Sequence, residues 1–449
     1  MAAPPTGQPT PITGPAGAGG RDGGLRAIGT ALRWTGYTLF FLMVFVPTAY
    51  QGPKAVLLAV VLAGICAGVV GRGRLPLDPR LLLMSVAFAG VGAFFVLRGL
   101  AFGAVGALSM FNVYVTWPLV FTVLVAGAAE AATLRGLVRV LVTSANAVAL
   151  YSMIYVLWAA GYWPSALYYP LDQGQAIGFY GAYVEFNLYA ISSLLFLTPF
   201  LTTALLVFPA VGAPVTRRTL WVSLALNLVT VLLTGRRALL LLLPLAPVLA
   251  LIARSWLPAA TKRESRTRVT RAVIGAAGLA AVLVAAIGAA GALVPGGFVE
   301  MVASGFRFNS DPVAMSRRDQ LMALLNGWAE HPLLGSGHGA PAPGVIRSVA
   351  MPWAYELSYV ALLYHTGAVG FAVYALGAAW IGVMCHRIAR SGWPDAPSLM
   401  AVFVGSTSFV IANATNPYLE KYDYIWIIFL PLAFINSYLV NRSHTAHAL

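Results

Sequence analysis

Charged residues are scarce in this chain. Asp, Glu, Lys and Arg make up 9% of its 449 residues, whereas a soluble globular domain carries about 25%. Hydrophobic residues make up 59%, and many apolar runs are long enough to cross a hydrocarbon core of about 30 Å. The runs do not alternate with a period of two, which excludes a β-barrel. The sequence therefore predicts an all-α polytopic membrane protein.

Cysteine and the common ligand-binding motifs are also lacking. Cys66 and Cys385 are the only cysteines, and both fall near the ends of apolar runs, where we interpret them as small buried hydrophobes. No His-x-x-Glu-His spacing is present, so no metal is indicated. There is no Walker A motif, no GxGxxG after a strand and no soluble domain large enough for a nucleotide. We expect no metal or other cofactor, and an enzyme of this kind must use a membrane-borne donor that is already activated.

The apolar runs divide the chain into four parts. Residues 1–32, rich in Pro, Gly and Ala, are expected to form a disordered cytoplasmic tail. Residues 33–294 should hold transmembrane helices 1–9, residues 295–355 a large extracytoplasmic loop carrying short helices, and residues 356–449 helices 10–12 with a short cytoplasmic tail. The expected spans, about twelve in number, are 34–50, 54–71, 81–97, 111–128, 136–160, 183–207, 219–234, 238–253, 272–294, 356–384, 397–412 and 424–440. The span 356–384 is long and could be tilted or broken.

The net charge of +14 raises the question of a nucleic-acid partner, but its distribution favours a membrane explanation. With a cytoplasmic N-terminus, 19 of the 28 lysines and arginines lie on the cytoplasmic side, including the basic run 254–271. This agrees with the positive-inside rule, so both termini are expected in the cytoplasm and no nucleic acid is expected. Six of the seven outer arginines fall in the "TGRRALL" turn and the loop 295–355.

The turn in "LLTGRRALLLLLPL" (232–245) places Arg236 and Arg237 at the outer junction of two apolar runs. A charge at such a depth costs several kcal/mol unless it is paired or hydrated, so it marks a candidate functional site. Arginine is suited to phosphate oxygens. The alternative is a pair of interfacial arginines that reach the lipid headgroups.

The stretch "RRDQLMALLNGWAEHPLLGSGHG" (317–339) is a polar island in the outer loop. Apolar residues at helical spacing predict a short helix on the membrane surface, with Arg317 and Arg318 at its start. Pro332 and three glycines should end this helix. His331 is interpreted as structural, and the role of His338 stays open.

Glu356 stands where the outer loop meets the next span, beside Tyr355. Partial burial would raise the pKa of this carboxyl and nearby arginines would lower it. Such a group can act as a general base. Alternatively, it pairs with an arginine only to hold the loop.

A second outer segment, "YYPLDQGQAIGFYGAYVEFNLYAISSLL" (168–195), offers Asn187, Glu185 and Asp172 among tyrosines. Aromatic side chains could stack on sugar faces, but tyrosines also populate membrane interfaces in general.

Three of these segments together resemble the O-antigen ligase and Wzy-type O-antigen polymerase superfamily, which are GT-C-like multispan glycosyltransferases. "LLTGRRALL" is similar to the family's Thr-x-Ser-Arg-Gly/Ala stretch, with Arg237 at its Arg and Arg236 replacing Ser. "RRDQLMALLNGWAEHPLLGSGHG" is similar to its Arg-x(13)-His-Pro-Leu-x-Gly-x-Gly segment, which puts Arg317 at the Arg. "YELSYVALLYHTGAVG" is similar to its third motif, in which ligases tend to carry His where this chain has Glu356. A Glu at this position is more similar to the polymerase members of the superfamily.

The resemblance implies a bacterial cytoplasmic-membrane enzyme that polymerises undecaprenyl-diphosphate-linked oligosaccharide repeats on the extracytoplasmic face, without a metal and with inversion. It implies catalytic roles for Glu356, Arg237 and Arg317. Substrate-binding roles are expected for Arg236, Arg318, His338, Tyr355 and Asn187. The implied partners are a lipid-diphosphate glycan donor, a glycan acceptor, membrane lipids, a chain-length regulator and a flippase.

Two alternatives to a polymerase remain open. A ligase of the same superfamily would move the finished glycan onto a lipid or protein. A glycolipid transporter or flippase belongs to another class; such proteins often contain inverted repeats, and no convincing internal repeat is visible in this sequence.

Overall fold

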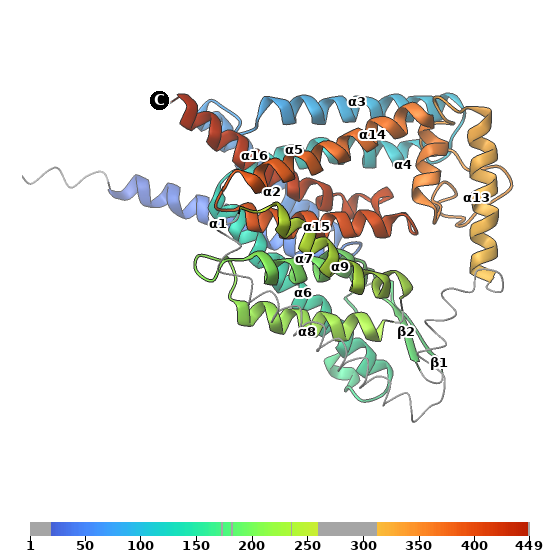
Figure 1. The fold of residues 1–449 in the computed structure, drawn as a ribbon, viewed down its shortest axis with the longest axis horizontal. Helices are drawn as coiled ribbons and strands as arrows, with labels where there is room; N and C mark the ends of the chain where they lie inside the picture. Colours follow the sequence, from blue (N-terminus) through green and yellow to red (C-terminus); the bar gives the residue numbers. More distant parts are fainter. Residues whose placement is uncertain (1–18, 172–173, 181–182, 235, 259–311, 448–449) are drawn as a thin grey trace, which may run out of the picture.

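The computed structural model describes residues 19–171, 174–180, 183–234, 236–258 and 312–447, which form mainly long helices (Figure 1). Ten helical segments in these ranges are long and apolar enough to cross a membrane, as the sequence predicts for a multi-pass α-helical protein. They are Ile28–Phe45, Gln51–Gly71, Pro79–Ala101, Ala107–Gly127, Ala131–Ala159, Tyr189–Val207, Ala238–Trp256, Ser358–Arg390, Ala396–Asn413 and Tyr422–Arg442.

Two of the expected spans are not among these ten. The span 219–234 corresponds to a helix of 17 residues, Arg217–Leu233. The span 272–294 lies outside the described residues.

The first half of the described chain is a series of helices interrupted by one hairpin. Its elements are α1 (Gly19–Phe45), α2 (Gln51–Arg72), α3 (Pro79–Ala101), α4 (Ala107–Phe111), the π-helix η1 (Asn112–Thr116), α5 (Trp117–Gly127), α6 (Ala131–Ala159), the 3₁₀-helix η2 (Ser165–Leu167), β1 (Ala176–Tyr180), β2 (Tyr183–Asn187), the 3₁₀-helix η3 (Tyr189–Ser193) and α7 (Leu194–Val207).

The remaining elements are α8 (Arg217–Leu233), α9 (Arg237–Trp256), α13 (Pro312–Glu330), α14 (Ser358–Arg390), α15 (Ala396–Asn413), the 3₁₀-helices η4 (Tyr418–Glu420) and η5 (Tyr422–Tyr424), and α16 (Trp426–His447). Helix starts follow local chemistry: Oδ1 of Asp78 accepts a hydrogen bond from the N–H of Arg80, and Oγ1 of Thr216 accepts one from that of Thr219.

Helix α1 begins at Gly19, inside the segment 1–32 that we expected to be an unstructured tail. Residues 25–32 are rich in Leu, Arg and Ala, which favour helices, so the first span extends backwards as a continuous helix. The expectation of disorder is therefore wrong for residues 19–32. Residues 1–18 lie outside the described part.

Helix α7 is the centre of the bundle, and all its side chains are buried. It packs most extensively against α15 and α9. A helix that is apolar on every side belongs in the interior, so its composition fixes this position. The polar residues lie at the ends of the helices around it.

The segment 176–187 is not helical, which corrects the expected start of a span at residue 183. β1 and β2 pair antiparallel, with Ala176 opposite Asn187 and Tyr180 opposite Tyr183. Two runs of β-branched and aromatic residues separated by Gly-Ala are a hairpin signal that the apolar composition obscured. The span begins later, at Tyr189.

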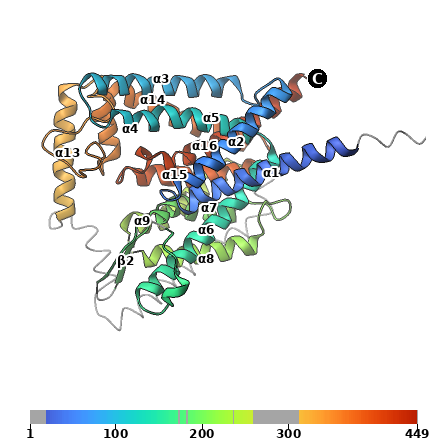
Figure 2. The ribbon, with the colours of Figure 1, turned by 180° about the vertical axis from the view of Figure 1, so that it is seen from behind.

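The bundle has two distinct ends. The start of α1 and the C-terminus lie together at one end, here called the terminal end, as both views show (Figures 1 and 2). The hairpin and α13 lie at the opposite end, here called the hairpin end. Helix α13 runs across the ends of α3 and α14 instead of parallel to them, as expected for a helix on a membrane surface.

Helix α14 is broken at Gly367, where φ is 63° and ψ is −172°. Four backbone hydrogen bonds of 2.8–3.1 Å join residues 332–337 to residues 364–369 at this break. A Cβ on Gly367 would lie 2.3 Å from backbone atoms of Leu333, so only glycine fits. The break expected in the long span is thus observed, and its freed backbone groups are satisfied by the loop.

Candidate functional site

Glu356 lies at the hairpin end, two residues before α14. Nε of Arg317 donates to its Oε2 at 2.6 Å, and Nε of Arg347 donates to its Oε1 at 3.3 Å. The backbone N–H of Glu356 donates to Oε1 of Gln320 at 3.1 Å. These four residues, here called the Glu356 cluster, bring one carboxylate between two guanidinium groups. The Glu356 side chain keeps 20% of its surface exposed and can meet a ligand.

Helix α13 positions half of this cluster. Arg317 and Gln320 are three residues apart and therefore lie on the same face. Gln320 is only 2% exposed, so its amide is a fixed contact. The predicted helix exists, but it begins at Pro312, five residues before Arg317, which we expected at its start; it presents Arg317 to Glu356. Arg318 points elsewhere: it is exposed, and no described residue pairs with it.

Tyr355 supports the loop on which Glu356 stands. Its side chain is fully buried; its hydroxyl accepts from the N–H of Ala342 at 2.5 Å and donates to the carbonyl of Val345 at 3.2 Å. Burial raises the pKa of Tyr355. The aromatic ring is therefore committed to the loop interior, and we assign Tyr355 a supporting position instead of a sugar-stacking surface.

A second carboxylate, Glu420, faces Arg347 from the turn between α15 and α16. Its Oε2 is buried and has no hydrogen-bond partner among the residues that the structure describes. Burial raises the pKa of Glu420 to about 8, and the charge of Arg347 opposes this rise. Arg347 therefore acts on two carboxyl groups: it pairs with Glu356, and its charge opposes the raised pKa of Glu420.

Lys421 follows Glu420 and extends the charges toward the hairpin. Its Nζ lies 5.2 Å from the ring centre of Tyr189. Burial lowers the pKa of Lys421, Asp423 opposes this shift, and Arg347 adds to it. The lysine and the arginine are thus close enough to repel each other, which favours an anion between or beside them.

Arg236 lies at the junction of α8 and α9, at the same end of the bundle. Its guanidinium donates to Oδ1 of Asn187, the last residue of β2. The N–H of Phe186 donates to the carbonyl of Thr234, at 3.4 Å, so the hairpin is tied to this junction. Asn187 therefore orients Arg236. The side chains of Arg237 and Glu185 lie outside the described part of the structure.

Four basic side chains at the hairpin end are here called the basic strip: Arg236, Lys421, Arg347 and Arg317. Arg236 contacts Asn187, and Lys421 contacts Tyr189, two residues further along the chain. Arg347 lies within electrostatic range of Lys421 and pairs with Glu356. No described hydrogen bond or ion pair joins Arg236 directly to Arg317 or Glu356.

His338 does not belong to the Glu356 cluster. Its ring is fully buried, stacks on Tyr114 with centroids 3.9 Å apart, and has Nε2 3.3 Å from the hydroxyl of Tyr374. Burial lowers the pKa of His338 well below its ordinary value, and His365 adds to this. A Cβ on Gly337 would lie 2.2 Å from the backbone of Gly99, which shows how deeply this loop inserts beside α3. We therefore interpret His338 as a neutral structural residue.

His331 also has a structural place. Its N–H donates to the carbonyl of Trp328 at 3.0 Å, and its ring lies 5.4 Å from that of Phe102. Within the described ranges, no three His, Cys, Asp or Glu side chains gather as metal ligands.

The sequence reasoning missed Gln320, Glu420 and the roles of Arg347 and Lys421. Each acts through a contact between segments far apart in the chain, which spacing alone does not show. One signal was available: the acidic and basic residues in "NPYLEKYDY" (416–424) interrupt two apolar runs on the expected outer side.

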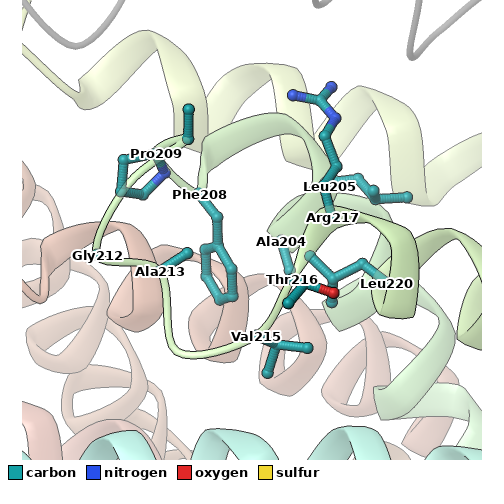
Figure 3. A pocket seen from close by; sticks show the side chains of 11 residues that line it. Ala204, Leu205, Phe208, Pro209, Gly212, Ala213, Val215, Thr216, Arg217 and Leu220 are labelled. Atoms are coloured by element: carbon teal, nitrogen blue, oxygen red, sulfur yellow. The ribbon is translucent and has the colours of Figure 1, made fainter.

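The cavities lie elsewhere. One of about 340 Å³ is enclosed by the turn between α7 and α8 at the terminal end, beside Phe208, Thr216 and Arg217 (Figure 3). None of the residues that line it belongs to the basic strip or the Glu356 cluster.

No protein-family model matches this chain, and no curated protein sequence matches it significantly.

Proposed function

We propose that this protein is a membrane glycosyltransferase that polymerises undecaprenyl-diphosphate-linked oligosaccharide repeats at the hairpin end. The observation that carries the proposal is the Glu356 cluster: a reachable carboxylate held by two arginines, next to further cations. A diphosphate needs such guanidinium groups, and an acceptor hydroxyl needs such a base. The resemblance of three sequence segments to the polymerase superfamily supports the same assignment.

The proposed reaction is a direct displacement. The acceptor hydroxyl oxygen attacks the anomeric carbon, its proton passes to Glu356, and the bond from that carbon to the diphosphate oxygen breaks. The electron pair leaves with the lipid diphosphate, whose charge the basic strip stabilises. Displacement from the opposite face inverts the anomeric centre. This chemistry needs no metal or nucleotide.

The ion pairs also explain how the base becomes available. Arg317 and Arg347 occupy one oxygen each of the Glu356 carboxylate when no donor is bound. A donor diphosphate would draw both arginines onto its own oxygens. The carboxylate oxygens of Glu356 would then be free to accept the proton of the acceptor hydroxyl only when the donor is bound.

The decisive experiment uses purified protein in liposomes with a lipid-diphosphate oligosaccharide and neither a gradient nor a nucleotide. We expect a ladder of lengthened lipid-linked products. Glu356→Ala and Arg237→Ala should abolish transfer while the protein still inserts, and Arg318→Ala, which removes the exposed neighbour of Arg317, should retain it.

The products separate the alternatives. A new glycan–acceptor conjugate without a ladder would indicate a ligase. Movement of the glycolipid between leaflets without a new glycosidic bond would indicate a transporter. Near-wild-type assembly by Glu356→Ala would sink the proposed mechanism.

A further inference from the structure

A second cavity, of about 170 Å³, lies among α1, α2, α5, α6 and α16, away from the Glu356 cluster. Side chains such as Leu39, Met43, Ile65 and Phe429 form its walls. An engineered apolar cavity of about 150 Å³ binds benzene, so this volume accepts part of a hydrocarbon chain. Here it is called the apolar slot.

The polar residues of the slot gather at one end. Arg33, Tyr37 and Thr133 line it near the terminal end, whereas Phe40 and Trp426 line it deeper in the bundle. The hydroxyl of Tyr37 lies 3.5 Å from the carbonyl of Thr133. The slot is therefore amphipathic along its length, with one cationic end and an apolar remainder.

The polar end of the slot lies at the level of a membrane interface. Trp34 is 66% exposed, and its ring lies 5.8 Å from that of Tyr37 in an edge-on contact. Tryptophan and tyrosine concentrate at the depth of lipid headgroups, and arginine reaches the phosphates there. Arg33 directly precedes Trp34 in the sequence and is exposed.

Local charge favours an anionic headgroup at this level. Tyr37 lies within electrostatic range of Arg33 and Arg139 and of one acid, Glu130. Two guanidinium groups against one carboxylate leave a positive balance, and one basic residue near a membrane surface contributes about 1 kcal/mol of attraction to anionic lipid.

We propose that the apolar slot binds an acyl chain of an anionic glycerophospholipid from the bilayer, whose phosphate lies at Arg33. This lipid is a structural ligand that fills the gap between α1 and the helices α5 and α16. The proposal is independent of the glycosyltransferase activity.

Gly36 offers a direct way to fill the slot. It lines the cavity, and a Cβ placed on it would meet no heavy atom within 4 Å. A larger side chain there enters open space instead of colliding with a neighbour. Gly90 on α3 has equally open surroundings but does not line the slot, so it provides a matched control.

The test is native mass spectrometry of the full-length protein incubated with phosphatidylglycerol or phosphatidylcholine of identical chains. We expect one phosphatidylglycerol to be retained by wild type and by Gly90→Phe. Gly36→Phe should lose that adduct at least about tenfold, since the chain and the ring compete for one volume. Arg33→Gln should lose about fivefold in its preference for phosphatidylglycerol.

Each outcome decides the proposal. Equal retention of both lipids by wild type overturns it, as does full retention by Gly36→Phe. A parallel incubation uses a polyprenyl phosphate. Stronger retention of this lipid than of phosphatidylglycerol also overturns the proposal, because the occupant would then be the lipid carrier. If Gly36→Phe fails to fold, the Arg33→Gln comparison still decides, because this substitution is at an exposed position.

Discussion

Arg347 connects the parts of the candidate site, because its guanidinium acts on Glu356 and Glu420 together. We predict that Arg347→Gln slows glycan transfer by about 10²–10³, which is the usual cost of losing one donor that stabilises developing negative charge. Arg347→Lys should recover only part of this, because an ammonium cannot fork onto two oxygens. The measurement is the initial rate of product formation in liposomes.

The control for this prediction is Arg318→Gln, which removes an exposed arginine from the same end of the molecule. Its rate should stay within about twofold of wild type, as expected for a surface substitution. Equal losses in both variants would mean that only the net positive charge of this end matters.

Glu420 should make stability depend on pH in a defined window. Its folded-state pKa is about 8, against an ordinary value of 4.5, so the folded protein holds this proton more tightly than the unfolded chain. The stabilisation is complete below pH 4.5 and is lost as pH rises through about 8. Relative to Glu420→Gln, wild type should therefore lose thermal stability from about pH 5 upwards, and the loss should level off only once pH has passed the folded-state pKa.

The measurement is the unfolding temperature of purified protein in detergent at each pH. Glu330→Gln, at an exposed position on α13, should track wild type throughout. A constant difference between wild type and Glu420→Gln would show that this carboxyl does not titrate in that window.

At the scale of elements, the break in α14 and the glycine-rich loop form one unit, since residues 332–337 hydrogen-bond across the break. We predict that Gly367→Ala destabilises the protein by about 2–4 kcal/mol, because the residue needs a left-handed φ of 63° and its Cβ would meet backbone at 2.3 Å. Thermal unfolding in detergent measures this.

Gly382→Ala is the matched control on the same helix. Its Cβ would meet only one atom, at 3.9 Å, and its backbone is helical. We expect it to stabilise slightly, by about 0.4–1 kcal/mol, through reduced freedom of the unfolded chain. A Gly382→Ala variant destabilised as much as Gly367→Ala would show that the loss is not specific to the break.

The elements that the sequence predicted well are those whose signal is local. Apolar length predicted the spans, and helical spacing of Leu321, Leu324 and Trp328 predicted α13. The hairpin was missed because its residues are as apolar as a span, and its period-two pairing covers only five residues a strand. Helix α1 continues back into the expected tail, where Leu, Arg and Ala in residues 25–32 favour a helix.

The candidate site was predictable in part for the same reason. Glu356 and Arg317 stood out as charges at the ends of apolar runs, and their pairing at 2.6 Å joins α13 to the loop before α14. Glu420 and Gln320 were not predictable, because their roles come from tertiary contacts across the bundle. The sequence left the role of His338 open; the glycines on either side of it let the loop insert beside α3, where His338 is buried.

At the scale of the whole molecule, the two ends of the bundle should face opposite sides of the membrane. The start of α1 and the end of α16 share the terminal end, as an even number of crossings requires (Figure 2). Helix α9 ends there too, with Trp256 4.9 Å from His386, whereas α13 lies at the hairpin end. The expected span 272–294 falls between α9 and α13 in the sequence.

This arrangement predicts sidedness that single cysteines can report. Val349, 95% exposed, is in the loop of the hairpin end, and Val211, 88% exposed, is in the turn between α7 and α8 at the terminal end. With Cys66 replaced by alanine, Val349→Cys should react with a membrane-impermeant maleimide in intact cells, and Val211→Cys only after permeabilisation. The physical reason is the excess of arginine and lysine in the terminal-end loops, which holds them on the cytoplasmic side. The reverse labelling pattern would place the Glu356 cluster in the cytoplasm, where an extracytoplasmic polymerase could not work.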